Sequence, residues 1–229
     1  MNAPTLSDRL DACTLFFVDM DDTLFEERDY ARSGFRAVAD HVGRRGLDAM
    51  EAGRFLENHF RLHGRVRIFD HLLLHLTGAI SPAQVQELVA VYREHDPHIA
   101  FYPGARQALS DLRRRGKVIL VTDGLAAMQQ RKFAALGLDR LVDRAVFCEA
   151  SGHPKPDPAS LAGLVEPGDP AALLIGDRPD HDLALAAALR IDSIRVRTGR
   201  FRDRPNDPWH PVADLPAFAD LLDLKPNGN

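Results

Sequence analysis

The stretch FFVDMDDTLF at residues 16–25 joins an apolar run directly to three aspartates, Asp19, Asp21 and Asp22. The apolar run over residues 13–19 is nearly continuous, which is typical of a parallel strand covered on both faces. In open parallel sheets, ligands bind beyond the carboxyl ends of the strands, so polar side chains at these ends matter most. The stretch therefore predicts a buried strand and the place of a site at its end.

Four further short segments are predicted to be strands, with helical patterns between them. These segments are residues 117–123, 144–150, 171–177 and 192–198. Residues 125–138 follow a helical pattern that stops at Gly137, and residues 181–190 are rich in Ala and Leu, which favour helix. Strands that alternate with helices predict an α/β fold with an open, Rossmann-like parallel sheet and right-handed crossovers.

One long interval breaks this alternation. Residues 25–100 contain no convincing strand pattern but four helical patterns, each with an apolar stripe. We therefore expect residues 25–100 to form a helical insert, placed directly after the first strand of a core made of residues 1–24 and 101–229. The Pro-rich residues 203–216 are expected to form a loop.

Polar side chains, most of them acidic, follow the apolar runs at several distant points of the chain. They are Asp19, Asp21 and Asp22 after the first run, Thr122 and Asp123 at the end of the second, and Asp177, Asp180 and Asp182 at and after the fourth. Because the ends of parallel strands share one edge, these groups are expected to converge. Crowded carboxylates repel one another unless a cation neutralises them, and hard oxygen ligands select Mg²⁺. Lys155, in SGHPKPDP at residues 151–158, adds a positive charge.

This ordered set resembles the four motifs of the haloacid dehalogenase superfamily. The matching residues are DMDDT at 19–23 for the first motif, Thr122 in VILVTDG for the second, Lys155 for the third, and Gly176, Asp177 and Asp182 for the fourth. The resemblance covers most of the chain, because the helical insert takes the position of the family's C1 cap. One departure is Asp22, where many members have glycine. The DxDDT form of the first motif resembles variants found within the family, so Asp22 does not argue against membership.

The resemblance implies a phosphatase that forms an aspartyl-phosphate. Asp19 would be the nucleophile, and Asp21 the general acid and then the general base. Thr122 and Lys155 would hold the phosphoryl oxygens, with Asp123 as a further substrate contact. Dehalogenase members lack an acid at the position of Asp21, because a halide leaving group needs no proton, so phosphate ester hydrolysis is favoured over carbon–halogen cleavage.

The same resemblance implies a Mg²⁺ cofactor. Its ligands would be the Asp19 carboxylate, the main-chain carbonyl of Asp21 and the Asp177 carboxylate. Asp182 would support these ligands from the second coordination shell.

The substrate class implied is a small phosphate ester, such as a sugar phosphate, phosphoglycolate, a nucleoside monophosphate or an acylated sugar-acid phosphate. A closing cap favours compact substrates because it excludes water from the reacting groups. A phosphomutase, which returns the phosphoryl group to a sugar, is an alternative within the superfamily. A non-catalytic binding or regulatory module on the same fold is less favoured, because every chemical position is filled.

Any one of these residues alone has a structural explanation, since a strand-end Asp often forms a turn or caps a helix. The ordered set favours the chemical interpretation. In the insert, Arg65 and Arg67 are candidate contacts for an anionic substrate, although arginines on a helical insert are more often solvated. His71 and His75 share one helix face, but no third metal ligand is evident in the sequence, so a partly exposed helix face is expected.

Composition narrows the class of protein. The chain has 229 residues, 45% of them hydrophobic, and a net charge of -4, which is typical of a globular enzyme and argues against nucleic acid as a partner. No apolar run approaches the roughly 20 residues of a membrane helix, and no signal peptide is evident. The two cysteines, Cys13 and Cys148, form no metal-binding pattern. We expect a cytoplasmic protein that is a monomer or a weak homodimer and does not bind membranes.

Overall fold

A computed structural model describes residues 5–224, which divide into two compact units. The α/β unit comprises the chain up to Glu27 and from Ala100 onward, and the helical unit comprises Arg28–Ile99. The strands are β1 (Leu15–Val18), β2 (Lys117–Thr122), β3 (Arg144–Phe147), β4 (Ala172–Gly176), β5 (Asp192–Val196) and β6 (Ala213–Leu215). The α-helices of the α/β unit are α1 (Leu6–Ala12), α6 (Ala105–Arg115), α7 (Ala126–Ala135) and α8 (Ala184–Leu189).

The six strands form one parallel sheet in the order β3-β2-β1-β4-β5-β6. Strand β1 is flanked by β2 and β4, with Phe17 opposite both Ile119 and Leu174. The predicted α/β fold with a parallel sheet is therefore confirmed. Because β1 lies inside the sheet, its carboxyl end has a strand on either side, and side chains from three strands can meet there.

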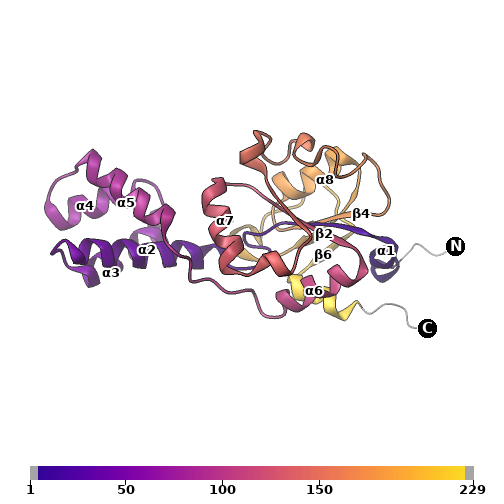
Figure 1. The fold of residues 1–229 in the computed structure, drawn as a ribbon, viewed down its shortest axis with the longest axis horizontal. Helices are drawn as coiled ribbons and strands as arrows, with labels where there is room; N and C mark the ends of the chain where they lie inside the picture. Colours follow the sequence, from indigo (N-terminus) through magenta and orange to yellow (C-terminus); the bar gives the residue numbers. More distant parts are fainter. Residues whose placement is uncertain (1–4, 225–229) are drawn as a thin grey trace. The chain divides into compact units, whose positions relative to one another are not determined.

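Helices cover both faces of the sheet, as the apolar runs required. Helix α8 lies on one side, where Leu185 and Leu189 join Phe17 and Val121 in a buried cluster. Helix α6 and the 3-10 helix η6 (Phe218–Asp223) lie on the other side (Figure 1). Complete burial of a Phe or Leu side chain stabilises the folded state by about 1.5–3 kcal/mol. The two-sided core holds the strand ends, and the polar groups that follow them, in fixed positions.

Several boundaries differ from the sequence prediction. Residues 203–216 were predicted to form a loop, but Ala213–Leu215 form strand β6, so the prediction was wrong for these three residues. They are a strand because they pair with β5, and the sequence alone does not indicate this pairing. Strand β3 is shorter than expected, since a 3-10 turn, η2 (Cys148–Ser151), follows it. A π-helical turn, η4 (Pro179–Leu183), precedes α8.

Short 3-10 helices complete the α/β unit. They are η1 (Leu138–Arg140), η3 (Pro158–Leu161), η5 (Gly199–Phe201) and η6 (Phe218–Asp223). Of these, η1 joins α7 to β3, and η5 follows β5 at the same edge as Asp19 and Asp177.

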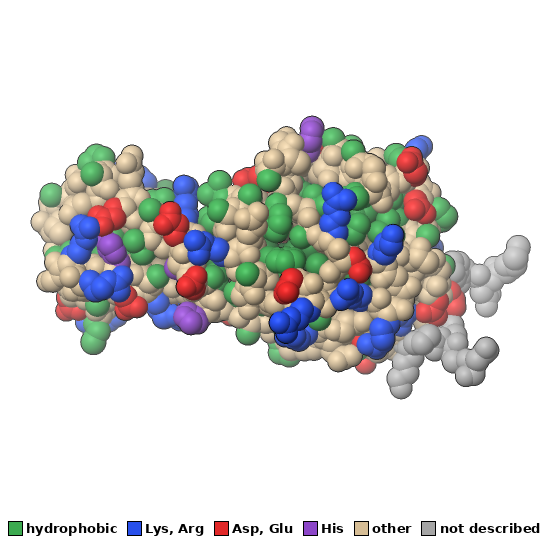
Figure 2. Space-filling view, in the orientation of Figure 1, with side chains coloured by type: hydrophobic (Ala, Val, Ile, Leu, Met, Phe, Trp, Pro, Cys, Tyr) green, Lys and Arg blue, Asp and Glu red, His purple; other side chains and the backbone are tan. Residues whose placement is uncertain are grey.

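The helical unit contains four helices. They are α2 (Glu27–Arg44), α3 (Ala49–His63), α4 (Ile68–Thr77) and α5 (Pro82–Glu94). Side-chain caps begin two of them: Asp48 accepts from the Glu51 N–H, and Ser81 accepts from the Gln84 N–H. On the face drawn in Figure 2, acidic and basic side chains are interspersed over each unit. Among residues 5–224, no helix has both the length and the apolar character needed to cross a membrane.

Candidate active site

Two neighbouring strands bring carboxylates together. Asp19 follows β1 and donates its N–H to the Ile175 carbonyl at 2.9 Å, while Asp177 follows β4 directly. The turn η4 then places Asp182 beside them, and one carboxylate oxygen from each of the three acids lies within 4.8 Å of the others. Within the described residues this is the one such cluster of potential metal ligands. All three side chains are buried.

Lys155 lies inside this acidic cluster. Its Nζ donates to Asp19 Oδ1 at 2.6 Å, to Asp182 Oδ1 at 2.7 Å and to the Val121 carbonyl at 3.3 Å. Its side chain is only 4% exposed. Burial would lower the pKa of Lys155, but Asp182 and Asp19 raise it well above its ordinary value. The lysine is therefore a fixed cation in contact with both acids.

Lys155 supplies one positive charge to a cluster of three acids, and Asp177 has no cation of the protein in contact with it among the described residues. Burial, reinforced by Asp19 and Asp182, raises the pKa of Asp177 to about 10. Burial raises the pKa of Asp19 to about 7 against the opposing charge of Lys155. The buried Asp177 Oδ2 has no hydrogen-bond partner among the described residues. Such an orphaned oxygen in a cluster of hard ligands fits a divalent cation, and Asp19 and Asp177 are the side chains placed to hold it.

Asp182 has a different environment from Asp177. Its Oδ1 accepts from Lys155, and its Oδ2 accepts from the Arg178 N–H at 2.9 Å. Both oxygens therefore have protein partners. The Asp182 carboxylate holds Lys155 in place and closes the turn that follows Asp177.

Two residues of the first motif fix the position of Asp19 and its loop. Thr23 Oγ1 donates to Asp19 Oδ2 at 2.9 Å, so each oxygen of Asp19 has a donor. Asp22 has a positive φ of 58°, and its carboxylate accepts from the Glu27 N–H at 2.9 Å and the Arg200 N–H at 3.3 Å. No role was predicted for Thr23 from the sequence, although the residue lies in the DxDxT motif.

Asp21 faces helix α7. Lys132 Nζ lies 2.8 Å from Asp21 Oδ1 and 2.9 Å from Oδ2, and Gln129 Nε2 donates to Oδ2 at 2.8 Å. Neither of these α7 residues was predicted from the sequence. The available signal was a polar pair three positions apart, which places both side chains on one face of an Ala-containing helix.

Thr122 and Asp123 lie where β2 ends. Thr122 is buried, and its Oγ1 accepts from Gln129 Nε2 at 2.6 Å. The Asp123 carboxylate accepts from the Lys155 N–H at 3.0 Å and lies 2.9 Å from His181 Nδ1. Although burial opposes ionisation, His181 and Lys155 lower the pKa of Asp123. Asp123 thus joins the ends of β2 and β4 to the loop that carries Lys155.

Arg65 and Arg67 belong to the helical unit. They lie on the turn between α3 and α4, where both side chains are exposed. The Arg65 guanidinium lies 5.8 Å from the centre of the Phe60 ring, and Arg67 forms an ion pair with Asp70 at 3.0 Å. The structure therefore gives both arginines local partners within this unit.

His71 and His75 line a cavity of about 430 Å³ in the helical unit. Two more histidines, His59 and His63 on α3, contribute to the same cavity, which the sequence did not indicate. The rings of His59 and His71 have centroids 5.0 Å apart, and His75 Nε2 lies 2.8 Å from a Glu51 oxygen. The histidine face of α4 is thus packed against α3.

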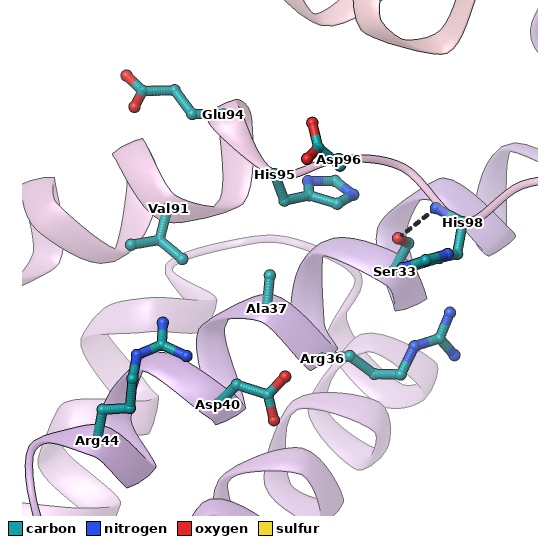
Figure 3. Close-up of a pocket in the computed structure, with 10 residues that line it drawn as sticks. All are labelled: Ser33, Arg36, Ala37, Asp40, Arg44, Val91, Glu94, His95, Asp96 and His98. Carbon is teal, nitrogen blue, oxygen red and sulfur yellow. Dashed lines mark hydrogen bonds between the residues drawn. The ribbon is translucent and has the colours of Figure 1, made fainter. Parts of the chain in front are cut away.

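A second cavity of about 520 Å³ lies between α2 and the end of α5 (Figure 3). Arg36 and Asp40 line it from α2, and Glu94, Asp96 and the histidines His95 and His98 line it from the end of α5 and the residues that follow. Charges of both signs line this cavity, so no single ligand charge is favoured.

Comparison with known proteins places this geometry in a family. A family model described as haloacid dehalogenase-like hydrolase matches residues 13–190. A glyceraldehyde 3-phosphate phosphatase of Methanopyrus kandleri is 30% identical, and the match covers 90% of this chain and 94% of that protein. A phosphoserine phosphatase of Thermus thermophilus is 30% identical over 63% of this chain and 57% of its own length.

The fold is also found in solved structures. The HAD hydrolase YfnB of Bacillus subtilis, described with bound magnesium, superimposes with a TM-score of 0.66 at 18% identity, covering 94% of this chain and 99% of that chain. A β-phosphoglucomutase-like protein of Thermotoga maritima gives a TM-score of 0.66 at 22% identity, covering 92% and 97%. At these identities the likeness concerns the fold alone. With the family match over residues 13–190, the chain belongs to the haloacid dehalogenase-like hydrolases.

Proposed function

We propose that this protein is a Mg²⁺-dependent phosphatase that hydrolyses a small phosphorylated metabolite through an aspartyl-phosphate on Asp19. One observation carries the proposal. The buried Asp19 carboxylate has Lys155 Nζ 2.6 Å from one of its oxygens and the Thr23 hydroxyl 2.9 Å from the other. The neighbouring Asp177 carboxylate has no hydrogen-bond partner for its Oδ2 among the described residues. An oriented carboxylate next to a buried cation is suited to attack phosphorus.

Mg²⁺ would be held by the Asp19 carboxylate, the main-chain carbonyl of Asp21 and Asp177. When bound, the ion supplies charge neutralisation between the carboxylates and a phosphoryl group. We assign Asp182 an indirect part, because both of its oxygens are taken by Lys155 and the Arg178 N–H.

The chain's own groups account for both halves of the reaction. Asp19 attacks phosphorus as the ester oxygen leaves, and Asp21 gives that oxygen its proton. Asp21 then removes a proton from the water that attacks the phosphoryl group, which releases Asp19 and inorganic phosphate. Thr122 and Lys155 hold phosphoryl oxygens. We assign Asp123 to positioning rather than substrate contact, since its carboxylate binds the Lys155 N–H and His181.

The substrate that we propose is a compact phosphate ester, such as a three-carbon sugar phosphate. Support comes from the Methanopyrus kandleri relative, a glyceraldehyde 3-phosphate phosphatase matched over 94% of its length. We propose that residues 25–100 serve as a cap that selects the substrate. Because metabolites of this kind are dissolved in the cytoplasm, we propose a cytoplasmic enzyme that acts without nucleic acid or membrane partners.

The test measures phosphate released from glyceraldehyde 3-phosphate, phosphoserine, phosphoglycolate and a nucleoside monophosphate, with Mg²⁺ and with a chelator. We expect Mg²⁺-dependent release that Asp19→Asn abolishes, whereas Asp139→Asn, at an exposed position, leaves the rate unchanged. Full activity of Asp19→Asn would contradict the mechanism. Incubation with a hexose phosphate, followed by product analysis, separates hydrolysis from a mutase reaction, which would yield an isomeric hexose phosphate.

A further inference from the structure

Helix α7 buries polar side chains. Its two buried residues are Gln129 and Lys132, whereas Met128 and Phe133 are only partly buried. Burial of an amide and an ammonium group opposes folding unless both find hydrogen-bonding partners. The inward face of α7 is therefore suited to contacting a polar group rather than to filling an apolar core.

That polar group is Asp21. Lys132 donates to both of its oxygens, at 2.8 and 2.9 Å, and Gln129 donates to Oδ2 at 2.8 Å. The same Gln129 amide nitrogen lies 2.6 Å from Thr122 Oγ1 and 2.5 Å from the Asp123 carbonyl, which fixes the amide itself. The Lys132 side chain is 5% exposed and that of Asp21 is 26% exposed, so Asp21 keeps an accessible side.

We propose that Lys132 and Gln129 are positioning residues that aim the Asp21 carboxyl group at the leaving oxygen of the substrate. The inference rests on the proposed phosphatase function. A general acid acts only within hydrogen-bond reach of the atom that it protonates, and a small misplacement costs a large factor in rate. Asp21 lies on the loop after β1, where it is only partly buried, and α7 restricts its rotation.

The reaction steps define where the two residues act. In the first, the Asp19–phosphorus bond forms, the bond to the leaving oxygen breaks, and the Asp21 proton passes to that oxygen. In the second, water attacks phosphorus, its proton passes to Asp21, and the Asp19–phosphorus bond breaks. Lys132 and Gln129 exchange no proton in either step, because they act through Asp21.

This role predicts a dependence on the leaving group that a merely structural role does not. An alkoxide needs a proton to leave, as in glycerol 3-phosphate, whereas 4-nitrophenolate leaves without one. For Lys132→Met we expect the first-turnover rate with the alkyl ester to fall by about 100-fold or more. The first-turnover release of nitrophenolate should change by less than about fivefold. Nitrophenolate should then appear as a burst of one equivalent, because the second step still needs Asp21.

Matched variants make the result decisive. Gln129→Met should give a smaller loss with the same leaving-group dependence, and Lys132→Arg should restore part of the alkyl ester rate. Lys117→Met, at an exposed position, should change neither rate. In an Asp21→Asn background, Lys132→Met should cause no further loss.

Equal losses with both esters, or an additional loss in the Asp21→Asn background, would overturn the inference while leaving the phosphatase function intact. Should Lys132→Met fail to fold, Gln129→Met and Lys132→Arg carry the same comparison. A wild-type enzyme that hydrolyses neither ester in the presence of Mg²⁺ would instead overturn the proposed function, and this inference with it.

Discussion

Gly199 packs so tightly against the carboxylate of Asp22 that a Cβ atom on the glycine would overlap the Asp22 side chain. Gly199 also has a positive φ of 61°. The Asp22 carboxylate is held there by the Glu27 and Arg200 N–H groups, and the Thr198 hydroxyl donates to the Asp22 carbonyl. Asp22 thus joins the β1 loop to the β5 loop, and Gly199 makes room for its side chain.

We predict that Gly199→Ala destabilises the protein through two separable effects. The positive φ costs about 1–2 kcal/mol for a residue with a Cβ, and the overlap with Asp22 adds about 1–3 kcal/mol. In an Asp22→Gly background only the first cost should remain. Urea unfolding of the four proteins in this double-mutant cycle measures the difference.

Gly137→Ala is the matched control for that cycle. Gly137 has nearly the same φ, 63°, but a Cβ atom at this position would meet nothing within 4 Å. Its substitution should show the backbone cost alone and no coupling to Asp22. If the effects of Gly199→Ala and Asp22→Gly on the free energy of unfolding were additive, the overlap between the two side chains would not contribute to the destabilisation.

A second prediction concerns the hydroxyl of Thr23. Thr23→Val keeps the side-chain shape but removes the donor to Asp19 Oδ2, a bond of 2.9 Å in a fully buried position. The hydroxyl holds one oxygen of the nucleophile in place, and misplacement of a reacting group can cost about 100-fold in rate, so kcat should fall by about 10-fold or more. Thr23→Ser keeps the hydroxyl and should retain most of the activity. Equal rates for the Val and Ser variants would exclude a role for this hydrogen bond.

Hydrophobic patterning predicted the parts of the fold that depend on long apolar runs. Strand β1 was predicted because residues 13–19 are apolar almost throughout, and β2 and β4 share this character. Strand β6 was not, because its three residues, Ala213–Leu215, carry little periodicity and gain their strand geometry from pairing with β5. Such short edge strands depend on tertiary contacts more than on local preference.

In the candidate site, too, some residues could be predicted from the sequence and others depend on tertiary contacts. Asp19, Asp177 and Lys155 follow strands or lie in motifs, so their sequence positions indicated where they meet. Gln129 and Lys132 had no such signal, since a polar residue on a helix is ordinarily solvated. Only the path of the chain shows that this face of α7 turns toward Asp21.

A third prediction concerns the buried cation of the site. Lys155→Met would leave Asp19 and Asp182 buried without their counter-charge. Removal of one partner from a buried ion pair costs about 3–5 kcal/mol, and loss of a cation that contacts the phosphoryl group should lower kcat by about 100-fold or more. Urea unfolding and phosphate release measure the two effects.

The exposed Lys117 again provides the control, since Lys117→Met should shift stability by less than about 0.5 kcal/mol. Adding Asp182→Asn to Lys155→Met removes one of the two unpaired charges and should recover part of the lost stability. Wild-type stability of Lys155→Met would show that the acids do not depend on this lysine.

The fourth prediction follows from the raised pKa values of the acids. The pKa of Asp19 rises from 3.8 to about 7 and that of Asp177 from 3.8 to about 10, mainly through burial. Between these values the folded, metal-free protein binds more protons than the unfolded chain, so its free energy of unfolding falls as pH rises from about 4 to about 10. A change of 1 kcal/mol shifts the Tm of a chain of this size by about 2–4 °C.

We therefore expect the Tm in chelator to drop by more than about 5 °C between about pH 5 and about pH 9. Mg²⁺ binds the folded state with its acids ionised, so millimolar Mg²⁺ should raise the Tm more at the higher pH. Asp177→Asn removes the strongest of these titrations and a proposed ligand, and should reduce both the pH slope and the response to Mg²⁺. Asp139→Asn should retain both. A metal-free Tm that rose with pH would show that the buried acids do not titrate in this way. If Asp177→Asn responded to Mg²⁺ like the wild type, Asp177 would not be a ligand of the metal site.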